Sequence, residues 1–196
     1  ARLRLETEMS VPDAEARGHM VADIAQVDAI IDKFLDYARP DHLSMEPLPL
    51  AEVALACALP FTVREDMQVQ IDIAPELRVM GDEVELSRVL SNLLENARRY
   101  GKSPDGQGTR VRIAATAHDF MVTLRVRDHG PGVAPELLPN LTRPFFRGDS
   151  ARTSATGAGL GLAIVDKAMQ RMGGSLEMAN APDGGLVAHL RLKRAV

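Results

Sequence analysis

The sequence predicts an α+β protein, in which a two-layer domain of about three helices and a mixed sheet follows part of a helical hairpin. Three observations lead to this prediction. Several short segments alternate between apolar and polar residues, as half-buried strands do. Prolines gather in a stretch at residues 40–49, which separates the first helical region from the rest. Apolar residues recur at helical spacing in four segments: 14–39, 51–59, 82–100 and 159–172.

Composition limits the classes of function. The chain has 196 residues, 45% of them hydrophobic, which is enough to bury a core. A net charge of -4 argues against a general nucleic-acid binder, which needs a basic surface. No apolar run approaches the roughly 18 residues of a membrane span. The single cysteine, Cys57, cannot form an internal disulfide and is typical of a small core residue. We therefore expect small-molecule and protein partners, and no nucleic acid.

Residues 1–39 form the first predicted unit. Residues 1–10 are typical of the end of one helix, and a second helix follows from residue 14. A broad apolar seam suits a helical hairpin that pairs with a second copy into a four-helix bundle. The alternative is an amphipathic helix that lies on its own domain. The seam has heptad spacing: Met20, Ile24, Val27, Ile31, Phe34 and Ala38, widened by Ile30 and Leu35.

The second predicted unit spans residues 48–196, after a linker at residues 40–47. Its first helix, residues 51–59, is expected to end at Pro60. Asp82 is a natural N-cap for the long helix that follows. The strands are predicted from their alternation, with His118-Asp119 and residues 183–185 as hairpin turns. They span residues 69–73, 77–80, 110–117, 121–128, 175–178 and 186–192.

The long central helix carries two amides beside its core face. At about 100° per residue, one stripe of this helix is polar and the neighbouring one is apolar. Asn is a poor residue for a helix interior, so two of them one turn apart indicate a function. The polar stripe consists of Glu85, Arg88, Asn92, Asn96 and Arg99, and the core stripe of Leu86, Val89, Leu90, Leu93, Leu94 and Ala97.

A second motif, Asp128-His-Gly-Pro-Gly132, directly follows a predicted strand. Gly130 and Gly132 let the backbone approach a flat ligand closely. A buried carboxylate at Asp128 needs a donor, and the exocyclic amine of adenine is a suitable one. Taken alone, the motif is equally well explained by an ordinary turn closed by the Asp side chain.

A third motif, Thr156-Gly-Ala-Gly-Leu-Gly-Leu162, leads into a helix. Its glycines and the first free amides of the helix would suit a triphosphate. The spacing of its glycines differs from that of a dinucleotide site. Another segment, Gly101-Lys-Ser103, is not a Walker motif, because that motif needs Gly at the position of Asn96. Arginines in the preceding segment, residues 129–158, can fork onto phosphate oxygens: Arg143, Arg147 and Arg152.

The order of these motifs is more specific than any one of them. With Pro144-Phe-Phe-Arg147 between the second and third, they resemble the N, G1, F and G2 boxes of two-component sensor histidine kinases. Those kinases belong to the Bergerat-type (GHKL) ATPase superfamily, with gyrase, Hsp90 and MutL. The resemblance covers residues 48–193. Residues 30–39 resemble the second dimerisation helix of kinases of the osmosensing type.

The resemblance implies roles for individual residues. Asn92, Asn96 and Arg99 would be catalytic, and Asn96 would bind Mg through its side-chain oxygen. Asp128 would read adenine, and residues 143–158 would form an ATP lid that orders on binding. The implied ATP-binding residues are Asn92, Asn96, Arg99, Tyr100, Asp128, Gly130, Gly132, Arg147, Thr156, Gly157, Ala158, Gly159, Leu160, Gly161 and Leu162.

One position separates the classes within the superfamily. Hydrolysing members carry a Glu one turn before the Mg-binding Asn, and this chain has Asn92 there. An amide cannot accept the proton of an attacking water. The resemblance therefore implies transfer of the γ phosphate to a histidine. A GHKL-type ATPase and a non-catalytic nucleotide-binding dimerisation module are the alternatives.

The implied acceptor histidine is missing from the sequence. None of the five histidines stands in the family pattern His-Glu/Asp-x-Arg/Lys-x-Pro. Residues 1–6 resemble the stretch just after the acceptor, so we expect that the acceptor lies upstream. The resemblance also implies a homodimer through the hairpin and a response-regulator receiver domain as partner. It implies a cytoplasmic domain of a parent anchored in the bacterial inner membrane.

Overall fold

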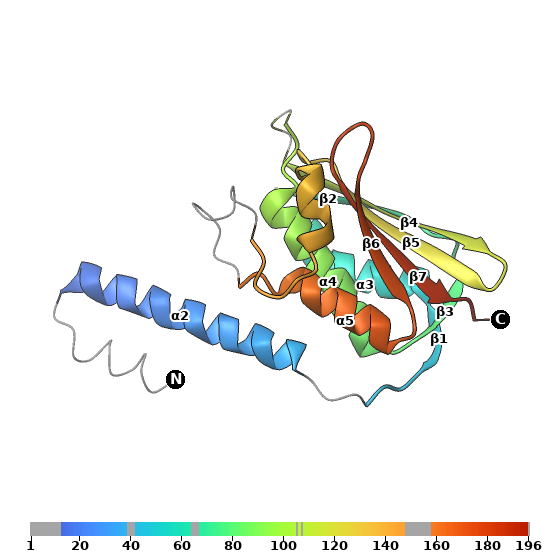
Figure 1. The fold of residues 1–196 in the computed structure, drawn as a ribbon, viewed down its shortest axis with the longest axis horizontal. Helices are drawn as coiled ribbons and strands as arrows, with labels where there is room; N and C mark the ends of the chain where they lie inside the picture. Colours follow the sequence, from blue (N-terminus) through green and yellow to red (C-terminus); the bar gives the residue numbers. More distant parts are fainter. Residues whose placement is uncertain are drawn as a thin grey trace.

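The computed structural model describes residues 13–38, 42–63, 67–104, 106, 108–147 and 158–195. A long helix, α2 (Ala14–Tyr37), extends beside a domain in which helices and sheet form two layers (Figure 1). The helices of the domain are α3 (Leu50–Thr62), α4 (Glu83–Tyr100) and α5 (Gly161–Arg171). The first half of the predicted hairpin, residues 1–12, lies outside the described residues.

A five-stranded mixed sheet forms the second layer. Its order is β2-β4-β5-β7-β6, in which β2 and β4 are parallel and the other neighbours antiparallel. The predicted hairpin between β4 and β5 is confirmed, with β5 at the expected bounds. The strands are β2 (Met67–Asp72), β4 (Thr109–His118), β5 (Met121–Asp128), β6 (Ser175–Asn180) and β7 (Leu186–Lys193).

The core lies between the two layers. Alternate residues of β5, namely Val122, Leu124 and Val126, are buried against the helices. The predicted core stripe of α4 is buried along its whole length, and Leu86 and Leu90 have no exposed area. The structure therefore confirms the α+β two-layer sandwich with three helices on a mixed sheet.

The central helix begins where the sequence predicts. The Asp82 carboxylate accepts hydrogen bonds from the backbone N–H of Glu85 (3.0 Å) and of Ser44 (2.8 Å). Burial raises the pKa of Asp82, but these two N–H groups and that of Val84 hold it below its usual value. The other end closes at Gly101, whose N–H donates to the Ala97 carbonyl (2.6 Å). Both ends of α4 are thus held by hydrogen bonds.

The structure differs from the sequence prediction around three prolines. Part of the expected linker forms a strand, β1 (Glu46–Pro49), which pairs with β3 (Arg78–Gly81). Prolines are tolerated here because β1 is an edge strand of a two-stranded sheet. Pro60 lies inside α3 and does not end it. A proline in the last turn removes a single hydrogen bond, and the buried apolar face of α3 offsets that loss.

Helix α2 contacts the domain through polar groups and leaves its apolar seam exposed. None of its residues is buried, and Val27 and Leu35 are 54% and 61% exposed. Lys167 of α5 donates to the Tyr37 carbonyl (2.9 Å) and lies 4.7 Å from the centre of the Tyr37 ring. Along the described part of the chain, no helix is long and apolar enough to cross a membrane.

Candidate functional site

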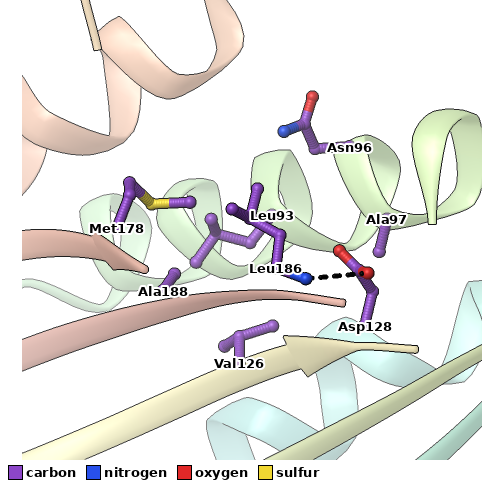
Figure 2. A pocket seen from close by; sticks show the side chains of 8 residues that line it. All are labelled: Leu93, Asn96, Ala97, Val126, Asp128, Met178, Leu186 and Ala188. Atoms are coloured by element: carbon purple, nitrogen blue, oxygen red, sulfur yellow. Dashed lines mark hydrogen bonds between the residues drawn. The ribbon is translucent and has the colours of Figure 1, made fainter. Parts of the chain in front are cut away.

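A small pocket lies between α4 and the ends of β5, β6 and β7 (Figure 2). Its empty volume is about 260 Å³, a figure that includes open solvent. Two polar side chains line it, Asn96 and Asp128, and both were predicted as site residues. The other lining residues are apolar: Leu93, Ala97, Val126, Met178, Leu186 and Ala188. A flat apolar ligand with one or two polar groups suits this lining.

The Asp128 carboxylate is held by one oxygen. Oδ1 accepts hydrogen bonds from the backbone N–H of Gly130 (2.9 Å) and of Leu186 (3.1 Å). The first of these hydrogen bonds closes the ordinary turn that is the alternative explanation of this motif. Within the described structure Oδ2 accepts no hydrogen bond, and the carboxylate lines the pocket (Figure 2). Oδ2 is therefore the acceptor that a ligand's N–H would meet.

Glycine backbones pack closely around this carboxylate. A Cβ on Gly101 would lie 2.7 Å from Cβ of Asp128, and one on Gly130 would lie 2.7 Å from Cα of Gly101. Gly185 has a φ of +92°, and a Cβ there would overlap the carbonyl oxygen of Asp128. Sequence reasoning missed the roles of Gly101 and Gly185. The sequence of residues 183–185 predicted a hairpin turn but not the contact of Gly185 with Asp128.

The two amides of α4 have different surroundings. The side chain of Asn96 lines the pocket and makes no hydrogen bond within the described structure. Asn92 is buried; its Nδ2 donates to the Arg88 carbonyl (2.9 Å) and its Oδ1 accepts from Nζ of Lys33 (3.0 Å). Lys33 belongs to α2, so this helix reaches a predicted site residue. No sequence motif indicated that contact.

Four of the five residues of the predicted polar stripe do not line the pocket. Glu85 is buried, and its Oε1 lies 3.1 Å from Nη1 of Arg88 and 3.6 Å from Nη1 of Arg171 on α5. A buried carboxylate between two guanidinium groups joins α4 to α5. The stripe therefore divides into a structural cluster near its start and an open amide, Asn96, near its end.

Arg99 and Tyr100 lie beyond the pocket lining. Nε of Arg99 donates to Oε1 of Glu95 (2.6 Å), and Nη2 of Arg98 donates to the same oxygen (2.7 Å). The hydrogen bonds from Arg98, with those from Arg99, lower the pKa of Glu95 to about 2. Tyr100 is exposed at the end of α4. Arg99 and Tyr100, both predicted as site residues, therefore lie at the C-terminal end of α4 and outside the pocket lining.

The glycine-rich segment is described from Ala158 onward; Thr156 and Gly157 lie outside the described residues. Gly159 has a φ of +68°, and a Cβ there would lie 2.8 Å from the Phe146 carbonyl oxygen. Its own carbonyl accepts a hydrogen bond from the N–H of Phe145 (2.9 Å). The predicted F motif and the predicted glycine-rich motif are therefore in direct contact, with Arg147 half-buried at the end of this segment.

Helix α5 begins at Gly161, close to Asn92. A Cβ on Gly161 would lie 3.6 Å from Oδ1 of Asn92. Leu160 is buried and Leu162 packs against the core, so apolar contacts hold this helix start. The first amides of α5 and the side chain of Asn92 thus lie close together.

Potential metal ligands are sparse. Among the described residues there is no group of three or more His, Cys, Asp and Glu side chains that could hold a metal ion. Mg needs few protein ligands when phosphate oxygens complete its shell. The side-chain oxygen of Asn96, which has no partner among the described residues, fits that kind of site.

Comparison with known proteins identifies the family. Residues 81–196 match the family model described as histidine kinase-, DNA gyrase B- and HSP90-like ATPase. The chain belongs to this ATPase family. Within it the chain resembles sensor histidine kinases: it is 37% identical over 198 residues to the sensor protein RstB of Escherichia coli K12, covering 94% of this chain. It spans only 30% to 42% of the length of three curated relatives that it matches.

Solved structures agree with this assignment. A mycobacterial sensor histidine kinase, MprB, has 32% identity and a TM-score of 0.66, covering 76% of this chain and 98% of the MprB chain. Full-length ShkA, solved in complex with AMPPNP, has a TM-score of 0.77 over 99% of this chain and 42% of its own. At 23% identity ShkA shows the fold alone.

Proposed function

We propose that this chain is the catalytic part of a two-component sensor histidine kinase, which binds Mg-ATP and transfers the γ phosphate to a histidine. One observation supports this most strongly. The pocket is lined by Asp128 and Asn96; within the described structure one carboxylate oxygen of Asp128 and the amide of Asn96 are unpaired, and both residues belong to family motifs in the expected order.

The base of ATP lies in the pocket of Figure 2. Oδ2 of Asp128 accepts a hydrogen bond from the exocyclic amine of adenine. The apolar side chains around it, such as Val126 and Met178, cover the faces of the ring. Gly130 packs so closely against the backbone of Gly101 that a side chain at residue 130 would displace the turn that carries Asp128.

The phosphates extend from the base toward Asn96 and the start of α5. Bound Mg would neutralise phosphate charge and orient the γ phosphate for in-line attack. Asn96 would be its one protein ligand, through Oδ1, while Arg99 and the amides at residues 157–162 would contact phosphate oxygens. Arg147 and Thr156 would belong to the lid over them.

Asn92 determines the expected fate of the phosphate. Its amide cannot act as a general base toward water, unlike the Glu of hydrolysing relatives. Phosphoryl transfer needs little more than positioning and charge neutralisation, and the nucleophile comes from the acceptor histidine. ATP is thus held for transfer and is spared from hydrolysis.

The rest of the parent follows from the same proposal. Residues 1–39 are part of a dimerisation hairpin, 40–47 a linker, and 48–196 the ATP-binding domain. The exposed seam of α2, with Val27 and Leu35, pairs with a second copy. The phosphohistidine passes its phosphate to an aspartate of a response regulator, and the parent is anchored in the bacterial inner membrane.

Phosphotransfer to a separate acceptor tests the proposal. The chain is incubated with γ-labelled Mg-ATP and with a dimerisation domain that carries the acceptor histidine. We expect label on the acceptor, in an acid-labile form typical of phosphohistidine, and little free phosphate when the acceptor is omitted. Tight ATP binding without transfer would contradict the kinase proposal. Steady phosphate release without acceptor would favour an ATPase instead.

A further inference from the structure

The turn that carries Asp128 is held at both ends by one pair of strands. At its start, the Leu186 N–H donates to Oδ1 of Asp128 (3.1 Å). Leu186 is the first residue of β7, and its partner in register is Asn180, the last residue of β6. The side chain of Asn180 reaches the other end of the turn, at Val133.

Asn180 makes two hydrogen bonds to one backbone unit. Its Oδ1 accepts from the N–H of Val133 (3.0 Å), and its Nδ2 donates to the carbonyl of Val133 (2.7 Å). Only a side-chain amide offers a donor and an acceptor in this fork. These two hydrogen bonds resemble those that a neighbouring strand would make to the N–H and the carbonyl of Val133.

The turn lies tightly against this amide. Gly132 has a φ of +71°, and a Cβ there would lie 2.7 Å from Oδ1 of Asn180. Met178, two residues earlier on β6, lines the pocket, so Asn180 lies on the same face of the strand. Asn180 itself does not line the pocket. It can act on a ligand only through the turn that it holds.

We infer that Asn180 is a positioning residue for the nucleotide site: it holds Gly132 and Val133 so that the Asp128 turn meets the base in one geometry. The inference rests on the proposed function, because it assumes that adenine occupies the pocket. Nothing in the sequence motifs marks Asn180, which follows the strand signal of residues 175–178.

The position of Asn180 predicts which kinetic quantity it controls. The hydrogen bonds act at the base end, far along the nucleotide from the transferred phosphate. Losing them should weaken MgATP and MgADP by the same factor, about tenfold for two neutral hydrogen bonds to backbone. The rate of transfer at saturating ATP should not change, so the effect appears in KM and not in kcat.

Calorimetry with two nucleotides tests the inference. MgATP and MgADP are titrated into the wild-type chain, Asn180→Ala and the isosteric Asn180→Asp, which keeps the acceptor and loses the donor. Gln170→Ala is the control, because it removes a side-chain amide hydrogen bond, to Asp166, on the exposed face of α5. We expect about tenfold weaker binding of both nucleotides for Asn180→Ala, about threefold weaker binding for Asn180→Asp, which loses one of the two hydrogen bonds, and wild-type affinity for the control.

Several outcomes decide between the possibilities. Melting temperatures measured without nucleotide identify a variant that fails to fold. If Asn180→Ala is unfolded, the inference is tested with Asn180→Asp alone. Binding within twofold of wild type by a folded variant overturns the inference. So does a fall in kcat with KM unchanged. If the wild-type chain itself binds no MgATP, the proposed function fails, and the role of Asn180 falls with it.

Discussion

The two ends of the proposed nucleotide site are built in different ways. At the base end, Asp128 is held by backbone N–H groups from its own turn and from β7, and the glycines around it are packed backbone to backbone. At the phosphate end, the functional groups are side chains on helices. Asn96 is unpaired within the described structure, and Oδ1 of Asn92 accepts a hydrogen bond from Lys33 of α2.

This difference separates recognition from chemistry. Backbone groups held by hydrogen bonds to a sheet are rigid, so we expect the proposed base end to be formed before a ligand arrives. Side chains can exchange partners, so the phosphate end can rearrange when nucleotide or the acceptor helix binds. Substitutions at the base end should therefore reduce stability or affinity, and substitutions at the phosphate end should change Mg dependence and transfer.

Gly185→Ala should have the largest effect. The added Cβ would overlap the Asp128 carbonyl at a residue with φ of +92°, so we expect a loss of about 3 kcal/mol in the free energy of unfolding. Chemical denaturation measures it. Gly184→Ala is the control, because its φ is +94° but its Cβ would meet its nearest atom only at 3.7 Å. Equal losses in the two variants would contradict close packing at the base end.

Asp128→Asn should follow, with an effect on affinity alone. The amide oxygen can still accept from Gly130 and Leu186, but an NH₂ group would then face the adenine amine. We expect MgATP binding about a hundredfold weaker, with the melting temperature retained. The control is Asp183→Asn, which changes a carboxylate bound to Arg127 outside the pocket. Unchanged ATP affinity in Asp128→Asn would show that the base does not lie there.

Asn96→Ala should act at the phosphate end. We expect the stability of the fold to be kept and the gain in ATP affinity on adding Mg to fall at least about tenfold, because the protein ligand of the metal is lost. Titrations with and without EDTA measure this gain. If wild type and Asn96→Ala respond equally to Mg, then Asn96 is not the ligand.

Lys33→Ala should have a smaller effect of opposite sign. Oδ1 of Asn92 must leave Lys33 before it can turn to a ligand, so removing the lysine should tighten MgATP binding about threefold, the equivalent of one hydrogen bond. Lys193→Ala, an exposed lysine on β7, controls for the lost charge. Weaker binding in Lys33→Ala alone would mean that the ammonium group helps to hold phosphate.

Glu95→Gln should have the smallest effect, on acid stability. The pKa of Glu95 is lowered to about 2, mainly by Arg98, so its ion pair stabilises the fold fully above its ordinary pKa of 4.5. This contribution is lost as the pH falls from 4.5 through about 2. The difference in melting temperature between wild type and Glu95→Gln should shrink over that range. A difference in melting temperature that stays constant over this pH range would contradict this role of Glu95. So would an equally large change with pH in the control Glu83→Gln.

The same contrast explains what could be predicted from the sequence. Alternation and capping residues are local signals, so the strand bounds of β5 and the N-cap at Asp82 were predicted correctly. The strand β1 was missed because prolines usually mark a linker, and its pairing with β3 is a long-range contact. The extension of α3 past Pro60 depends likewise on packing.

The candidate site shows a similar division. Asp128 and Asn96 were identified from motifs and lie at one pocket. Glu85 and Arg88 share the stripe of Asn96 by helical geometry, but Arg171 from α5 turns them into a structural cluster. Asn180 at the end of β6 and Gly185 in the turn before β7 pack against the Asp128 turn, although both lie more than 50 residues later in the sequence. Only the folded sheet brings them together.

A structure of the chain with Mg and AMPPNP tests the account most directly. We predict that the exocyclic amine of adenine lies within hydrogen-bond distance of Oδ2 of Asp128. Mg should contact Oδ1 of Asn96, and Asn92 should face the γ phosphate, released from Lys33. A nucleotide whose base lies away from Asp128, or whose Mg has no contact with Asn96, would contradict the proposed site.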